Sequence, residues 1–246
     1  MPHVEGAGVA LHYLARGEGP VVVLVHGMAS DARAWKPALA QLADAGLRAI
    51  ALDRRGYGDS GAPEPYAATT VQEQAEDVAA LLGALGAAPA LLAGEGFGAL
   101  VVLELLVRRP ELVRGAVLAD PPLHAFVPAA TAALAEERTL LEEGLREGGR
   151  AAAVRAWLAA AGVAADDDRT TRAVAAAQGF FADYAGQSSW SPSRGELRAV
   201  AVPVAVVTGP ATAPHVVAAA DAVARLVPGA SRADDGDAVA AVLRLG

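Results

Sequence analysis

The stretch that most constrains the fold runs from Leu91 to Leu100, where an apolar run leads into Gly94-Glu95-Gly96-Phe97-Gly98. This spacing has the frame of a nucleophile elbow, a sharp strand-to-helix turn that ordinarily carries Gly-x-Ser-x-Gly. Gly96 stands at the serine position. We expect Gly94 and Gly98 to be required because the strand and helix backbones approach closely there. A loose dinucleotide-binding turn has similar glycines, so the rest of the chain decides.

Strand and helix patterns alternate on both sides of this turn. Continuous apolar runs predict buried strands, an alternating run predicts an edge strand, and 3.6-residue periodicity predicts helices. Asp31 and either Thr69 or Thr70 are the expected helix N-caps. The alternation predicts an α/β fold, with a mostly parallel, doubly wound sheet. The expected strands are 9–14, 21–25, 49–52, 91–93, 113–118, 203–208 and 230–233, and the helices are 32–45, 72–85, 97–109, 215–226 and 238–245.

The length and the pattern together predict one domain with an insertion. The 246 residues are 54% apolar, which suits one α/β domain better than two. Residues 123–197 have a helical pattern without a convincing buried strand, so we expect a helical lid inserted after strand 113–118, the sixth strand of a sheet of this type. Residues 1–122 and 198–246 then form the core of a single domain, 1–246.

Composition excludes several kinds of site and partner. The chain has no cysteine, so disulfides and thiolate sites are excluded. A net charge of -8 argues against nucleic acid or an anionic membrane as a partner. No secretory signal and no membrane-spanning run are visible, so a cytoplasmic protein is expected. No histidine and carboxylate cluster has metal-ligand spacing, and we expect neither a metal nor a cofactor.

Five segments in order resemble the α/β-hydrolase family. They are His26-Gly27, the run from Asp53 to Ser60, the elbow frame, Asp120-Pro121-Pro122, and the strand ending at Gly209. The resemblance implies a triad in the order serine, acid, histidine. The serine position is Gly96, residues 209–214 contain no carboxylate, and residues 232–237 contain no histidine. We therefore predict that the chain is not a Ser-His-Asp hydrolase.

Other polar residues are candidates for a relocated site. Asp120 is at the position of an alternative acid, with capping of the lid segment as its expected role, and His124 is the best free imidazole, although a packing role is favoured for it. His26 is expected to support the loop of Gly27 and Met28. The other three histidines, His3, His12 and His215, have no partner spacing, and the side chain of Glu95 is expected to point away from the pocket.

A binding pocket is the feature that we expect the chain to keep. The backbone N–H groups of Met28 and Phe97 occupy the oxyanion-hole positions, and Phe97 begins a helix whose dipole favours negative charge. The scattered aromatic residues suggest an apolar pocket, with packing of the lid as the alternative for each one. The expected substrate-binding residues are Gly27, Met28, Ser30, Trp35, Gly96, Phe97, Asp120, His124, Phe126, Trp157, Phe180, Phe181, Tyr184 and Trp190.

Because it lacks the triad residues, the chain also resembles the atypical α/β-hydrolase-fold epimerase of bottromycin biosynthesis. That resemblance implies an isomerase that inverts an aspartyl α-carbon next to a thiazoline in a ribosomally made peptide antibiotic, with the substrate as base. The alternative is a catalytically inactive protein that binds a small molecule or a peptide. A hydrolase in which Asp120 or Asp53 takes a new role is the least favoured hypothesis. The expected partner is accordingly a modified peptide or a small molecule.

Overall fold

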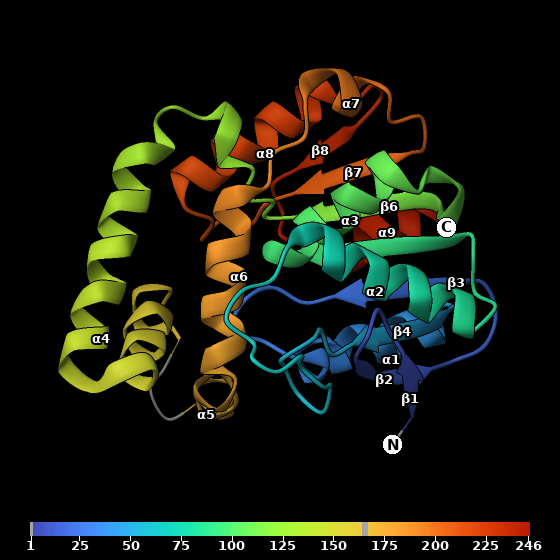
Figure 1. Ribbon diagram of the computed structural model, residues 1–246. Coiled ribbons are helices and arrows are strands. Elements are labelled where there is room, and N and C mark those ends of the chain that lie inside the picture. The colour runs from blue at the N-terminus through green and yellow to red at the C-terminus, as the bar shows by residue number, and fades with distance from the viewer. Residues whose placement is uncertain (1, 164–166) are drawn as a thin grey trace.

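One eight-stranded sheet forms the centre of the molecule (Figure 1). The computed structural model describes residues 2–163 and 167–246. The strand order is β1-β2-β4-β3-β5-β6-β7-β8, and all neighbours from β4 to β8 are parallel. The doubly wound α/β fold predicted from the sequence is therefore confirmed. The strands are His3–Glu5 (β1), Ala10–Arg16 (β2), Val21–Val25 (β3), Arg48–Leu52 (β4), Ala90–Glu95 (β5), Val113–Ala119 (β6), Val204–Val207 (β7) and Ser231–Ala233 (β8).

The central strands follow directly from their apolar runs. Parallel strands that are covered on both faces need apolar side chains on both faces, and four of the five residues of β3 are buried. The predicted strand 21–25 agrees with β3 at both ends. The sequence missed β1, which pairs antiparallel with β2 at the edge of the sheet. Its three residues are too few to show an alternating pattern.

Helices cover both faces of the sheet. Lys36–Asp44 (α1), which a 3-10 turn Ala32–Trp35 (η1) precedes, and Ala238–Leu245 (α9) pack on one face. The other face carries Val71–Ala84 (α2), Phe97–Arg108 (α3) and Pro214–Leu226 (α8). Thr70, rather than Thr69, is the N-cap of α2, where it forms a capping box with Glu73. Each face is thereby buried in its own apolar core.

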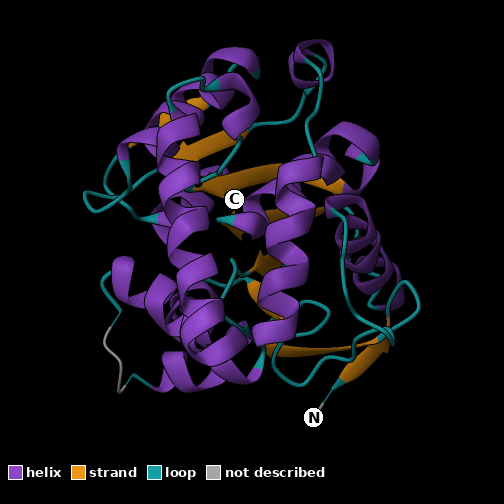
Figure 2. Ribbon diagram, turned by 60° about the vertical axis from the view of Figure 1, so that its left-hand side comes forward, coloured by secondary structure: helices purple, strands orange, loops and turns teal. Residues whose placement is uncertain are grey.

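In the part of the chain that the structure describes, four helices lie between β6 and β7, and they form the segment that we call the lid. They are Ala130–Ala160 (α4), Asp168–Ala175 (α5), Ala177–Ser189 (α6) and Arg194–Arg198 (α7), and a 3-10 turn His124–Phe126 (η3) precedes them. Figure 2 shows the long lid helices in front of the sheet. Gly148 and Gly149 leave helical geometry and divide α4 into two arms. The predicted lid range 123–197 includes residues 164–166, which lie outside the described residues.

The buried ion pair between Arg54 and Asp183 holds α6 against the core. Asp183 of α6 accepts hydrogen bonds from Arg54 Nη2 at 2.7 Å, Tyr57 Oη at 2.6 Å and Gln74 Nε2 at 2.7 Å. Asp183 is fully buried and Arg54 is 1% exposed. Just after the C-terminal end of α6, Trp190 Nε1 donates to Glu104 at 2.9 Å. The position of α6 over the sheet is therefore fixed at its middle and just beyond its C-terminal end.

Among the described residues, no helix is both long and apolar enough to cross a membrane.

Candidate active site

The strand-to-helix turn has the geometry of an elbow. Gly96 lies between β5 and α3 with φ 55° and ψ −122°, which is a backbone conformation that glycine adopts most easily. A Cβ added to Gly94 would clash with the carbonyl of Gly98, and a Cβ added to Gly98 would clash with the carbonyl of Val25. These contacts confirm the reason that we predicted for both glycines. At Gly96, by contrast, an added Cβ would meet only Gly27 Cα at 3.7 Å, so the space above the turn is open.

Two backbone N–H groups belong to residues next to this open space. Those of Met28 and Phe97 have no hydrogen-bond partner within residues 2–163 and 167–246. His26 holds the loop before Met28, because its Nε2 accepts from the backbone N–H of Arg54 at 3.1 Å and its Nδ1 contacts the Gly27 carbonyl at 2.8 Å. Burial keeps the pKa of His26 well below its usual value, so the ring is neutral. The loop is supported by His26 as predicted.

A cavity of about 280 Å³, here called the inner cavity, lies beside these N–H groups. The elbow, the end of β6 and the start of α8 form part of its wall, and α4, α5 and α6 of the lid close it. Seven of the predicted site residues line it, namely Gly27, Met28, Gly96, Phe97, Asp120, His124 and Trp157. The inner cavity therefore joins the proposed oxyanion donors to the two best polar candidates from the sequence.

Two carboxyl groups line the inner cavity. Asp120 directly follows β6 with φ 47°, and its Oδ1 accepts from Thr212 Oγ1 at 2.7 Å. Thr212 Oγ1 in turn accepts from the backbone N–H of Gly209 at 2.8 Å, so the loop after β7 positions Asp120. Burial raises the pKa of Asp120 and that of Glu95. Both expectations for these carboxylates were wrong, since Asp120 does not cap a lid helix and Glu95 does line the cavity.

Two imidazoles meet on the same wall. The rings of His124 and His215 have their centroids 5.3 Å apart and are tilted by 50°. Burial, together with the charge of His215, lowers the pKa of His124 to about 4. The Nε2 atom of His124 is buried and has no hydrogen-bond partner in the described part of the chain. His124 is therefore a neutral base with a free ring nitrogen at neutral pH.

Several cavity residues could not be found from the sequence. His215 is in the first turn of α8, 91 positions after His124 along the chain, and was predicted to have no partner. Arg169 from α5, Glu137 from α4 and Gln187 from α6 also line the inner cavity. Only the way in which the lid folds over the sheet brings them there, and no spacing along the chain signals it.

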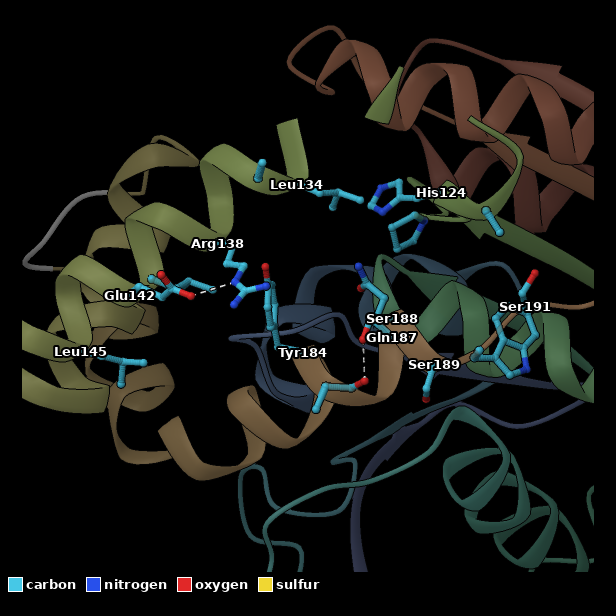
Figure 3. A pocket seen from close by; sticks show the side chains of 16 residues that line it. His124, Leu134, Arg138, Glu142, Leu145, Tyr184, Gln187, Ser188, Ser189 and Ser191 are labelled. Atoms are coloured by element: carbon cyan, nitrogen blue, oxygen red, sulfur yellow. Dashed lines mark hydrogen bonds and ion pairs between the residues drawn. The ribbon is translucent and has the colours of Figure 1, made fainter. Parts of the chain in front are cut away.

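A second space, here called the outer groove, is lined from α4 and α6 of the lid (Figure 3). Its volume is about 800 Å³, and its lining includes Tyr184, Trp190 and His124 from the predicted set. The remaining predicted residues line neither space. Ser30 and Trp35 are buried next to α1, Phe126 packs under Arg194, and Phe180 and Phe181 belong to the apolar core of the lid.

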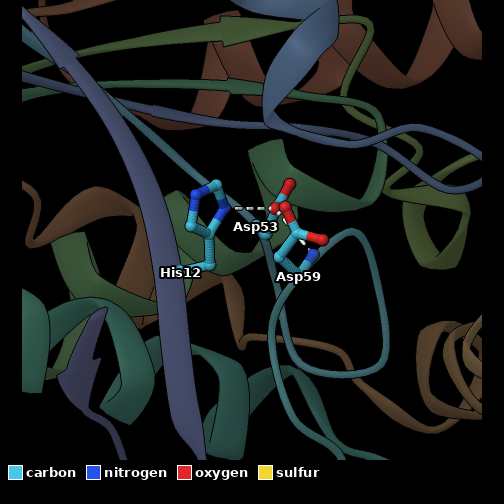
Figure 4. Close-up of side chains that lie close together, drawn as sticks. All are labelled: His12, Asp53 and Asp59. Atoms are coloured by element: carbon cyan, nitrogen blue, oxygen red, sulfur yellow. Dashed lines mark hydrogen bonds and ion pairs between the residues drawn. The ribbon is translucent and has the colours of Figure 1, made fainter. Parts of the chain in front are cut away.

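A third cluster of polar residues lies apart from both spaces (Figure 4). His12, Asp53 and Asp59 have possible ligand atoms within 4.8 Å of one another, which the sequence did not indicate. The carboxylate of Asp53 is already engaged by His12 Nδ1 at 2.7 Å and by the backbone N–H groups of Ala32 and Asp59 at 2.7 and 3.0 Å. These contacts fix the loop after β4, so Asp53 has a structural role.

The comparison with protein families decides the classification. The model of the alpha/beta hydrolase family matches residues 22–242. The chain belongs to this family. A solved alpha/beta hydrolase from Sphaerobacter thermophilus is similar over 98% of both chains, with a TM-score of 0.78 and 25% identity. The resemblance in the strand, loop and elbow segments is therefore confirmed at the level of the family.

Curated relatives of this alpha/beta hydrolase are named as hydrolases. Epoxide hydrolase A from Mycobacterium tuberculosis is 37% identical over 129 residues, which are 51% of this chain and 40% of that protein. Bifunctional epoxide hydrolase 2 from Sus scrofa is 33% identical over 121 residues, which are 49% of this chain and 21% of that protein. The alignments thus span about a fifth to two fifths of the length of these relatives.

These relatives overturn the prediction of an isomerase. The epimerase hypothesis depended on missing triad residues, a feature that any divergent member of a hydrolase family can share. The named relatives are epoxide hydrolases, and none of the findings supports a peptide epimerase, a bottromycin pathway or a loss of hydrolase activity. The prediction of an epimerase is therefore wrong, and hydrolysis, the least favoured hypothesis from the sequence, is the direction in which the relatives point.

Proposed function

We propose that this alpha/beta hydrolase cleaves an ester or lactone bond by direct attack of water, without a serine nucleophile. The observation that supports this most is the composition of the inner cavity. It combines the backbone N–H groups of Met28 and Phe97 with the Nε2 atom of a neutral imidazole, His124, and none of the three has a hydrogen-bond partner among the residues that the structure describes. An acyl substrate needs these two functions, a site for the oxyanion and a base for the attacking water.

The proposed reaction begins with proton transfer to His124. Water loses a proton to His124 Nε2 as its oxygen bonds to the carbonyl carbon, and the carbonyl oxygen becomes an oxyanion. Donation from the N–H groups of Met28 and Phe97 stabilises this charge, and the positive end of the α3 dipole adds to the effect. The tetrahedral intermediate collapses, the bond to the leaving oxygen breaks, and His124 returns its proton to that oxygen.

The space around the elbow fits this reaction. Glu95 and Asp120 line the same cavity as His124, and burial raises the pKa of both carboxyl groups. Gly96 leaves the space above the elbow open to the carbonyl carbon and the attacking water.

A single turnover in heavy-oxygen water tests direct attack. The protein in excess is mixed with phenyl acetate in H₂¹⁸O, and the acetate from the first turnover is analysed by mass spectrometry. Direct attack of water places ¹⁸O in that acetate. Acetate with only ¹⁶O would show that an enzyme carboxylate, from Glu95 or Asp120, supplied the oxygen, and no hydrolysis of phenyl acetate or a simple lactone would refute the proposal.

Replacement of His124 tests the identity of the base. His124→Gln keeps the size of the side chain and removes the basic nitrogen, so we expect kcat/KM to fall by roughly 10² or more. In the unmodified protein kcat/KM should rise with pH through about 4, where His124 loses its proton, and then level off. His3→Gln, on the exposed strand β1, is the matched control and should retain full activity. An unchanged rate in His124→Gln would exclude His124 as the base.

A further inference from the structure

The outer groove suits an uncharged apolar chain. Its lining includes Leu134, Leu141 and Leu145 from α4, together with Tyr184 of α6 and Trp190. The charged side chains in its lining neutralise each other, because Arg138 Nε donates to Glu142 Oε1 at 2.8 Å. Its volume of about 800 Å³ is within the range of sites that bury most of a ligand of drug size.

The outer groove and the inner cavity are adjacent. Pro122, His124 and Gln187 line both of them, and these three residues are here called the junction. A molecule whose reacting group lies in the inner cavity therefore has its remaining part directed past the junction into the groove. The volumes of the outer groove and the inner cavity together limit the size of such a molecule.

The junction contains two polar atoms that lack partners. Gln187 Oε1 and His124 Nε2 are both buried, and neither has a hydrogen bond within the described residues. Buried polar atoms in folded proteins are ordinarily hydrogen-bonded. The Nε2 atom of neutral His124 is an acceptor that the attacking water uses, so the unpartnered Gln187 Oε1 atom indicates a ligand with an N–H donor of its own. A secondary amide offers one N–H and one C=O in a fixed planar arrangement. It suits the junction whichever way the Gln187 amide is turned.

We propose that the substrates are N-acyl compounds, in which an acyl chain occupies the outer groove and its amide hydrogen-bonds at the junction. This inference rests on the proposed function, since it takes the hydrolysed carbonyl group to lie in the inner cavity. An ester or lactone group follows the amide there, within reach of the N–H groups of Met28 and Phe97. The amide itself is recognised and is not cleaved.

Binding of ketones that cannot be hydrolysed tests this inference separately from catalysis. Three probes are compared by calorimetry, namely N-decanoylaminoacetone, its analogue with two methylenes in place of the amide, and N-acetylaminoacetone. We expect the decanoyl amide to bind about tenfold more tightly than the methylene analogue, because a junction hydrogen bond is lost. Each methylene buried in the groove should strengthen binding roughly fourfold, so the acetyl probe should bind far more weakly.

Variants of the junction and of the groove separate the two parts of the ligand. Gln187→Leu should abolish the preference for the amide and keep the preference for the long chain. Ala135→Trp, from an exposed position in the groove lining, should weaken binding of the decanoyl probe and leave the acetyl probe unaffected. Ala132→Trp lies on the same helix outside the lining and should change neither affinity.

The outcomes distinguish the inference from the proposed function. A methylene analogue that binds as tightly as the amide would refute the hydrogen bond between the ligand amide and the junction. It would indicate that water, and not the ligand, hydrogen-bonds to the polar atoms there. Equal binding of short and long amides would refute the groove as the site of the chain. Expected binding of the ketones, together with no hydrolysis of the phenyl ester of N-decanoylglycine, would support this inference and refute the proposed hydrolysis.

Discussion

At the scale of single residues, Gly96 shows how a family frame can persist without its usual side chain. The sequence placed this glycine correctly in the strand-to-helix turn, because its neighbours Gly94 and Gly98 are dictated by backbone packing. Which residues line the site in place of the usual serine side chain could not be predicted. His124 and His215 approach each other only through the folding of α8 against η3, and Glu95 turns toward the cavity through the local geometry of the turn.

Substitution of Gly96 tests the strain at the elbow. Gly96→Ala meets no close atom, but it places a Cβ at φ 55°, so we expect a loss of unfolding free energy of about 1–3 kcal/mol. Gly195→Ala in the exposed helix α7 is the control, and it should be neutral or stabilising by up to about 1 kcal/mol. Urea denaturation measures the free energy of unfolding of both variants. Equal stability of the two variants would contradict the strain assigned to the elbow.

At the scale of elements, the arrangement of the lid was less predictable than its helical content. The residues between β6 and β7 have helical periodicity, so helices were expected there, and helices are what the described residues contain. The kink at Gly148 and Gly149, and the buried contact between α6 and the loop after β4, depend on tertiary packing. Asp183 carried no signal in the sequence, although it decides where α6 and Gln187 lie.

Removal of the Asp183 carboxylate should strongly destabilise the protein. Asp183→Asn leaves the guanidinium of Arg54 buried without its counter-charge, for which we expect a loss of roughly 3–5 kcal/mol. Glu142→Gln breaks the exposed pair with Arg138 on α4 and should cost less than about 1 kcal/mol. Urea unfolding compares them. A similar small loss for both would show that the buried pair does not hold α6.

Replacement of both partners tests whether the loss comes from the isolated charge. Arg54→Met combined with Asp183→Leu should be less destabilised than the sum of the two single variants, because neither buried charge is then left alone. The double variant also loses the bonds from Arg54 to the carbonyls of His26 and Gly27, so we do not expect it to recover fully.

At the scale of the whole molecule, the fold was predictable and the site was not, for one physical reason. Each buried strand needs a run of apolar residues, and such runs are visible locally, as in β3. The inner cavity instead draws on the ends of β5 and β6, on three lid helices and on the start of α8. Its composition depends on contacts between distant parts of the chain, which a single sequence does not record.

The two histidines with lowered pKa values should make stability fall in mildly acidic solution. In the folded protein burial keeps His26 and His124 neutral, whereas the unfolded chain protonates its histidines near pH 6.5. Between pH 6.5 and about 5 the unfolded state therefore binds more protons, so the contribution of these residues is fully present above pH 6.5 and is lost as the pH falls. Glu95 and Asp120 have the opposite sign, but their carboxyl groups titrate closer to pH 4 in the unfolded chain.

We expect the contribution of His26 to the free energy of unfolding to fall by about 1.4 kcal/mol for each pH unit below 6.5. The contribution of His124, which retains contact with solvent, should fall less steeply. Urea unfolding at pH 8, 7, 6 and 5 measures this slope. His124→Gln should reduce the slope, because glutamine takes up no proton in either state. His3→Gln, at an exposed position on β1, is the comparison variant. If the two variants have the same slope as the unmodified protein, His124 is not held neutral by the fold, and its proposed role as the base loses its physical support.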